Sequence, residues 1–182
     1  MGEPRSSDRG PAGEPAHASP EAELTHLDDR GHARMVDVGD KPATAREAVA
    51  SAVVRLRPET ARRLASGTLP KGDALAVARV AGIMAAKQTP QLIPLCHVVA
   101  LAGVAVDVEV SSDPPAARVV ARVRAADRTG VEMEALVAAS TAALALYDMI
   151  KAIDRGAVIE QVRLERKTGG VRGDWQRDGS DG

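Results

Sequence analysis

One apolar stretch in the last third of the chain, residues 129–151, constrains the fold more than any other segment. Its sequence, TGVEMEALVAASTAALALYDMIK, carries charges only towards its two ends, and between residues 135 and 146 only Ser140 and Thr141 are polar. A helix that is apolar or small all round must be covered on several sides. Its uncharged run of about 13 residues is shorter than the roughly 20 that cross a bilayer. The stretch therefore predicts a helix in the core of a soluble domain.

Ionisable side chains stand at both ends of this predicted helix. Glu132 and Glu134 lie in its first turn, and Asp148 and Lys151, three residues apart, share a face of its last turn. Burial of such groups is costly unless they are paired, so they are candidates for function. From the spacing alone, an ordinary ion pair at a helix end is as well supported as a functional site.

The distance between these groups sets a condition on any site that uses them. Glu134 and Asp148 are 14 residues apart, which is about 21 Å at 1.5 Å per residue. Both cannot touch one small ligand within one subunit, so a shared site requires two chains. Antiparallel pairing of this helix with its symmetry mate would bring the start of one copy to the end of the other. The Ala-rich surface of the helix permits that close approach.

Charge and composition exclude several classes of protein. With 182 residues, a net charge of -1 and a pI near 6.4, the chain lacks the basic surface of a nucleic-acid-binding protein. One Tyr, one Trp and no Phe leave no stacking platform for single strands. Cys96 is the only cysteine, which excludes an intrachain disulfide and disfavours a metal site. We see no leader or long apolar span and expect a cytoplasmic protein without membrane association.

The remaining patterns predict an α+β fold. Residues 1–23 are rich in Pro, Gly and charged residues and are expected to form a disordered tail. Residues 24–167 are expected to form one domain, and residues 168–182 a Gly-rich closing loop and tail. Within the domain, alternation predicts strands at residues 44–57, 104–110, 118–125 and 158–167. Apolar periodicity and capping predict helices at residues 58–66, 74–88 and 129–151. This order is typical of a ferredoxin-like split βαβ fold, an antiparallel sheet with helices packed on one face.

Further candidate site residues lie at element ends or in apolar runs. Lys71 precedes a predicted helix N-terminus, where free backbone N–H groups suit an anion, although most lysines at such positions are only solvated. His97 lies in the apolar run QLIPLCHVVAL, where a histidine is more often a hydrogen-bonded core residue than a ligand. Lys167 stands just before a Gly-Gly pair. Together with the carboxylates of the long helix, these groups suit acid–base chemistry on an anionic substrate.

Five motifs occur in one order along the chain: KGDALAVARVAGIMAAK, LIPLCH, DRTGVEMEALVAAS, LYDMIKA and RLERKTGG. By these motifs, residues 24–175 closely resemble cyclic pyranopterin monophosphate synthases, the molybdenum cofactor biosynthesis protein C family. The resemblance implies a ferredoxin-like fold and a homo-hexamer built as a trimer of dimers, with sites at the dimer interface. It implies conversion of (8S)-3',8-cyclo-7,8-dihydroguanosine 5'-triphosphate to cyclic pyranopterin monophosphate with release of diphosphate, and no cofactor.

The resemblance also implies roles for individual residues. Asp148, Lys71 and Lys151 match the catalytic positions of the family, although which of them acts as acid or base stays open. Eight residues match substrate-binding or further pocket positions: Arg46, Leu95, Cys96, His97, Glu132, Met133, Glu134 and Lys167. Among these, Arg46, His97 and Lys167 are expected to hold the triphosphate.

The chain departs from the family's pattern in two loops. Val98 stands where the family usually has Pro after LCH, and the closing loop KTGGVRGD has Val171 in place of a second lysine, with Arg172 beside it. Two other classes of function remain as alternatives, a non-catalytic ligand-binding module and a purely structural oligomerisation domain. A sensor would not need two lysines and an aspartate at helix ends. An oligomerisation domain would have no use for LCH and VEMEAL.

Overall fold

The computed structural model describes residues 30–171 and 173–178, and residues from Met35 onward form one compact unit. The strands are β1 (Thr44–Arg55), β2 (Leu101–Ser112), β3 (Pro115–Asp127), β4 (Val158–Thr168) and β5 (Trp175–Gln176). The helices are α1 (Pro58–Ala65), α2 (Ala74–Lys87), α3 (Thr89–Leu92) and α4 (Glu132–Ile150). The predicted tail over residues 1–23, the predicted domain start at residue 24 and Arg172 lie outside the described residues.

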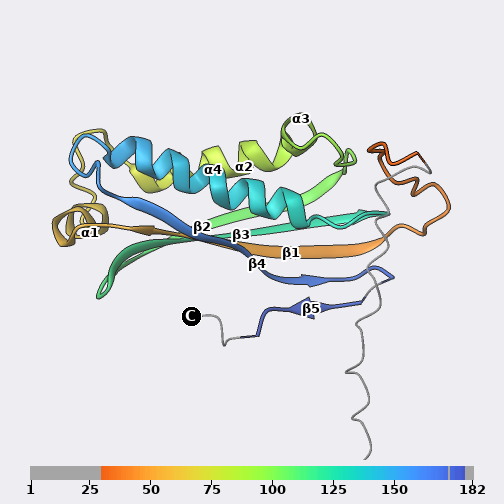
Figure 1. Cartoon of the computed structure of the whole chain (residues 1–182). Coiled ribbons are helices and arrows are strands. Elements are labelled where there is room, and N and C mark those ends of the chain that lie inside the picture. The colour runs from red at the N-terminus through yellow and green to blue at the C-terminus, as the bar shows by residue number, and fades with distance from the viewer. Residues whose placement is uncertain (1–29, 172, 179–182) are drawn as a thin grey trace, which may run out of the picture. The chain divides into compact units, whose positions relative to one another are not determined.

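All five strands belong to one antiparallel sheet, in the order β2-β3-β1-β4-β5. Helices α2 and α4 lie side by side over one face of it, as Figure 1 shows. Helices connect β1 to β2 and β3 to β4, so each of these connections skips over a strand that lies between its two ends. This topology confirms the predicted ferredoxin-like α+β fold.

Small side chains build the core between the helices and the sheet. Alternate residues of β1 and β3 point into it, including Ala48, Ala50, Ala52, Val54, Ala117, Val119, Ala121 and Val123. Helix α2 comes close to α4 at Gly82, where an added Cβ would lie 2.9 Å from the carbonyl oxygen of Ala138. Larger residues in these positions would force the two layers apart, so the Ala- and Gly-rich composition is what allows close helix packing.

Helix α4 has the length and hydropathy of a membrane span, but its environment is that of a core helix. Nine of its residues are buried within the domain: Glu134, Ala135, Val137, Ala138, Ala139, Ala142, Ala143, Leu146 and Ile150. It packs against α2 and the sheet, as predicted from its lack of a polar face. The predicted strand and helix positions of the chain otherwise hold to within a few residues at their ends.

Three local features were not predicted from the sequence. A short helix, α3, follows α2 directly, and β5 adds two residues to the sheet beside the end of β4. Ser51 on β1 is also buried, at only 1% exposed, and its hydroxyl donates a hydrogen bond to Glu165 on β4. Long side chains from the neighbouring strands account for this burial: Arg118 and Arg163 both pair with Glu165 there.

Candidate active site

Three of the sequence-predicted site residues meet at the end of α4, and we call Lys71, Asp148 and Lys151 the C-terminal cluster. The Lys151 Nζ atom lies 2.7 Å from Oδ1 of Asp148, and the Lys71 Nζ atom lies 3.5 Å from its Oδ2. Lys71 Nζ also donates a hydrogen bond of 2.8 Å to the backbone carbonyl of Asp148. Lys71 and Asp148 are 77 residues apart in the sequence, and the packing of α2 beside α4 brings them together.

The opposite charges in the C-terminal cluster stabilise one another. The hydrogen bond and charge of Lys151, followed by the charge of Lys71, hold the pKa of Asp148 below its usual range. The same hydrogen bond, which Lys151 donates to Asp148, raises the pKa of Lys151. All three side chains are exposed, at 58% for Asp148, 52% for Lys151 and 40% for Lys71. The cluster is therefore an ionised triad that is accessible to solvent at this end of the domain.

The two helix ends near Lys71 account for the direction of its side chain. Asp73 caps α2 by accepting a hydrogen bond of 2.9 Å from the Ala76 N–H, so a carboxylate already occupies that helix end. Lys71, which the sequence placed beside an anion at this terminus, turns instead to the end of α4. Carbonyl groups at a helix C-terminus carry partial negative charge, which favours ammonium groups there.

At the other end of α4, the LCH motif meets the Met-Glu pair. His97 Nε2 lies 2.8 Å from the carbonyl oxygen of Val36. A carbonyl only accepts, so Nε2 carries the proton, and Nδ1 of a neutral imidazole is an acceptor. Glu134 is only 3% exposed, and burial, followed by the charge of Glu132, raises its pKa. Burial, followed by the charge of Glu134, likewise raises the pKa of the Cys96 thiol.

Two cations lie at the same end of the domain, where β1 begins and β4 ends. Arg46 donates hydrogen bonds of 3.2 Å to the carbonyl oxygens of Asp127 and Arg128, in the turn that leads into α4. Lys167 Nζ donates a hydrogen bond of 3.1 Å to the carbonyl oxygen of Gly173. Gly170 has a φ of +86°, and an added Cβ there would overlap the Arg46 guanidinium. The Gly-Gly turn therefore leaves the space that Arg46 occupies.

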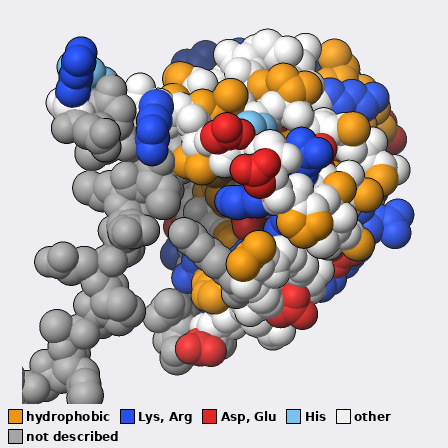
Figure 2. Space-filling model, turned by 90° about the vertical axis from the view of Figure 1, so that its right-hand side faces the viewer, with side chains coloured by type: hydrophobic (Ala, Val, Ile, Leu, Met, Phe, Trp, Pro, Cys, Tyr) orange, Lys and Arg blue, Asp and Glu red, His pale blue; other side chains and the backbone are white. Residues whose placement is uncertain are grey.

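We call the predicted site residues at this end of α4 the N-terminal cluster. They are Arg46, Leu95, Cys96, His97, Glu132, Met133, Glu134 and Lys167. Figure 2 looks onto this end of the molecule, where acidic, basic and histidine side chains lie close together among apolar ones. The C-terminal cluster lies at the opposite end of α4 (Figure 1). The 14 residues from Glu134 to Asp148 correspond to about 21 Å of helix. Within one chain, the predicted site residues thus form two half-sites rather than one.

The N-terminal cluster is held by groups that sequence reasoning missed. Backbone carbonyls of Asp127, Arg128 and Gly173 bind its cations, and the Asp127 carboxylate accepts a hydrogen bond of 3.4 Å from the Ala100 N–H. No residue type marks a carbonyl that will bind a cation, so the sequence held no signal for these contacts. Among residues 30–171 and 173–178, no group of three or more His, Cys, Asp or Glu is arranged to hold a metal ion.

The sequence matches the MoaC family over residues 35–170, which is most of the chain and includes both clusters. The chain belongs to the MoaC family. Among the relatives of this MoaC-family chain, the cyclic pyranopterin monophosphate synthase of Herpetosiphon aurantiacus is 60% identical over 153 residues, covering 84% of this chain and 93% of the relative. The protein of the same name from Streptomyces coelicolor is 56% identical over 158 residues, covering 87% and 92%. The one from Roseiflexus is 58% identical over 157 residues, covering 86% and 99%.

Proposed function

We propose that this MoaC-family chain is a cyclic pyranopterin monophosphate synthase of molybdenum cofactor biosynthesis, a lyase. It converts (8S)-3',8-cyclo-7,8-dihydroguanosine 5'-triphosphate to cyclic pyranopterin monophosphate and releases diphosphate. The shared name of relatives at 56–60% identity supports this reaction. The single structural observation that carries the proposal is the contact of both Lys71 and Lys151 with Asp148, because these are the residues expected to be catalytic.

The C-terminal cluster has the chemistry that this reaction needs. Asp148 stays ionised and can accept a proton, while the ammonium groups of Lys71 and Lys151 can donate one. Ring opening and pterin closure both require such transfers at positioned groups. Formation of the cyclic phosphate joins a substrate hydroxyl oxygen to the α phosphorus and breaks the bond from that phosphorus to the oxygen that bridges the α and β phosphates. The hydroxyl proton passes to a base, and nearby cations stabilise the charge that develops on the departing diphosphate.

The N-terminal cluster is the binding half of the proposed site. Arg46, Lys167 and His97 hold the triphosphate, and Arg46 and Lys167 lie at the same end of neighbouring strands. Glu134, with Glu132, Met133, Leu95 and Cys96, binds the purine-derived part. Burial raises the pKa of the Glu134 carboxyl, and a carboxyl in its protonated form donates as well as accepts hydrogen bonds. The binding half therefore offers both cations for the phosphates and a carboxyl for the base.

Each complete site is built from two chains in this proposal. The distance of about 21 Å between Glu134 and Asp148 excludes their joint contact with one small substrate inside one chain. A dimer with antiparallel α4 helices brings the N-terminal cluster of one copy to the C-terminal cluster of the other, and three dimers form a hexamer. We propose further that the enzyme acts in the cytoplasm, on a small-molecule substrate, without cofactor, metal, nucleic acid or membrane.

The direct test is incubation of the purified protein with the cyclised dihydro-GTP intermediate. The proposal predicts that diphosphate and cyclic pyranopterin monophosphate appear in equal amounts. GTP in place of the intermediate is the control and yields neither product. Binding of the intermediate without formation of diphosphate would contradict the proposal and favour the alternative of a ligand-binding module.

A further inference from the structure

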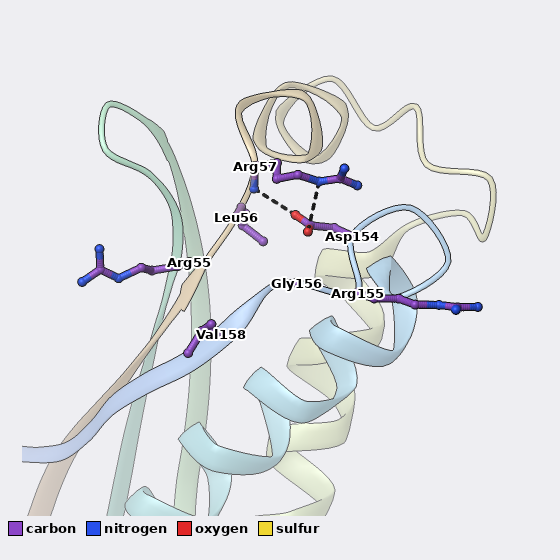
Figure 3. A pocket seen from close by; sticks show the side chains of 7 residues that line it. All are labelled: Arg55, Leu56, Arg57, Asp154, Arg155, Gly156 and Val158. Atoms are coloured by element: carbon purple, nitrogen blue, oxygen red, sulfur yellow. Dashed lines mark hydrogen bonds and ion pairs between the residues drawn. The ribbon is translucent and has the colours of Figure 1, made fainter.

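A buried carboxylate fixes the loop that follows the C-terminal cluster. The side chain of Asp154, in the loop between α4 and β4, is only 1% exposed. Its Oδ2 accepts a hydrogen bond of 2.9 Å from the backbone N–H of Arg57, and its Oδ1 lies 3.2 Å from Nε of the same residue. Figure 3 shows both contacts. One side chain thus ties this loop to the junction between β1 and α1.

Further hydrogen bonds join the last turn of α4 and Arg57 to the same loop. The Arg57 guanidinium also donates to the carbonyl oxygen of Ile153, and the Tyr147 hydroxyl donates a hydrogen bond of 3.1 Å to the carbonyl oxygen of Arg155. The N–H groups of Ile153 and Asp154 both donate to the Ile150 carbonyl oxygen at 2.9 Å. Lys151 is the first residue of this loop. Its position therefore depends on where the loop is held.

We infer that the Arg57–Asp154 pair is a positioning device for the C-terminal cluster, which sets where Lys151 and Asp148 stand relative to Lys71. The inference rests on the proposed function, since that function makes these three residues catalytic. The Asp154 carboxylate binds Arg57 rather than any member of the cluster, so it acts through the loop. Displacement of a catalytic group by about 1 Å can lower a rate about 100-fold.

Two features of the surroundings make the loop depend on the Arg57–Asp154 pair. The neighbouring arginines point away from Asp154, and open space lies beside the loop. Asp154 is buried, whereas the Arg57 side chain is 65% exposed, so the buried charge depends on that guanidinium for its compensation. In Figure 3 the side chains of Arg55 and Arg155 extend away from Asp154. A cavity of about 540 Å³ lies beside the pair, lined in part by Leu56, Gly156 and Val158. If the pair is broken, the loop has room to move.

Two variants test this positioning role. Asp154→Asn keeps the shape of the side chain and removes its charge, and Arg57→Gln keeps the backbone N–H donor and removes the guanidinium. We expect kcat of the full-length enzyme to fall about 10- to 100-fold in both variants, and at least as far in Arg57→Gln, because that variant leaves the buried Asp154 charge without its guanidinium. KM should change less than about twofold, because the binding residues lie at the other end of α4. Amide hydrogen exchange at Lys151, Ile153 and Asp154 should become faster in both.

Two controls separate positioning from a general loss of stability. Val123→Ala removes core volume in β3, where Val123 is 0% exposed, without touching the loop. Glu160→Gln breaks the neighbouring pair of Glu160 with Arg55, in which Nε and Oε1 are 2.7 Å apart. Both controls should keep the wild-type kcat well below their melting temperatures. If Val123→Ala lowers kcat as much as Asp154→Asn, or if kcat is unchanged in both test variants, the inference is overturned.

The exchange measurement keeps this inference separate from the proposed function. An inactive wild-type protein would refute the proposed reaction, but it would leave the exchange rates readable. Faster exchange at the three amides, and not elsewhere in α4, would then still support the pair as the anchor of this loop. Unchanged exchange in both test variants would overturn the inference whatever the activity.

Discussion

The two ends of α4 place carboxyl groups in opposite environments. At its start, Glu134 is 3% exposed, and burial raises its pKa. At its end, Asp148 is 58% exposed, and two lysines lower its pKa. One helix therefore presents a carboxyl that favours its proton and a carboxylate that favours its charge. Pairs of groups whose pKa values are pushed apart are typical of sites that move protons.

The difference also explains why one chain alone is not a complete enzyme in this account. The N-terminal cluster has buried groups and a binding surface but no exposed ionised triad. The C-terminal cluster has the triad but none of the three residues proposed to hold the triphosphate, Arg46, His97 and Lys167. Because the helix separates them by about 21 Å, only a second copy brings the two environments together.

Removal of Lys151, one of the lysines proposed to be catalytic, gives the largest expected effect. Lys151→Ala breaks the 2.7 Å contact with Asp148, so we expect kcat to fall by about 10² to 10⁴, as for loss of a general acid or base. Substrate binding should persist, since the N-terminal cluster is untouched; equilibrium binding and steady-state turnover measure the two effects. Lys87→Ala, an exposed lysine at the end of α2, is the matched control and should be fully active. Lost binding with Lys151→Ala would place this lysine in the binding half instead.

A change at the other end should alter binding rather than turnover. In Gly170→Ala the new Cβ overlaps the Arg46 guanidinium and displaces it from the position in which we propose that it binds the triphosphate. Loss of a charged hydrogen bond is worth about 1.5–3 kcal/mol, so we expect KM to rise about tenfold or more. Gly67→Ala, with a φ of +66° and open space around it, imposes similar backbone strain at the end of α1 and should leave KM unchanged. Equal effects of both variants would show that strain, and not Arg46, is responsible.

The smallest effect concerns the pH dependence of stability. The pKa of Glu134 is raised in the folded state, so its stabilising contribution is complete below the pKa of the unfolded chain. That contribution is lost as pH rises through the raised folded-state pKa. Glu134→Gln should remove this dependence, and its advantage over wild type should grow with pH over that window. Urea unfolding at a series of pH values measures it, with the exposed Glu109→Gln as control; parallel wild-type and Glu134→Gln profiles would contradict the burial argument.

Much of the fold was predictable because periodicity reports directly on burial. The alternation along β3 and the apolar run of α4 located both elements, and the order of elements gave the topology. The strand β5 escaped because two residues show no periodicity. The burial of Ser51 escaped because it depends on Glu165, a partner 114 residues away. Features that depend on a specific distant side chain leave no local pattern to read.

The site was predictable in its residue types but not in its contacts. The i, i+3 spacing of Asp148 and Lys151 predicted their contact, and the helix length predicted the separation of the two half-sites. The direction of Lys71 was not predictable, because it follows from the packing of α2 against α4. The Arg57–Asp154 pair was missed altogether, since an aspartate after a helix carries no sign of which arginine will bind it.

Mixing two inactive variants tests the two-chain site most directly. Lys151→Ala destroys the C-terminal cluster, and His97→Ala destroys the N-terminal cluster. When the two are co-expressed or refolded together, half of the dimers are mixed, and each mixed dimer holds one site with both halves intact. The account predicts recovery of about a quarter of wild-type turnover from inactive parents, for random pairing in a two-fold symmetric dimer. No recovery, with mixed oligomers detected by native mass spectrometry, would contradict it.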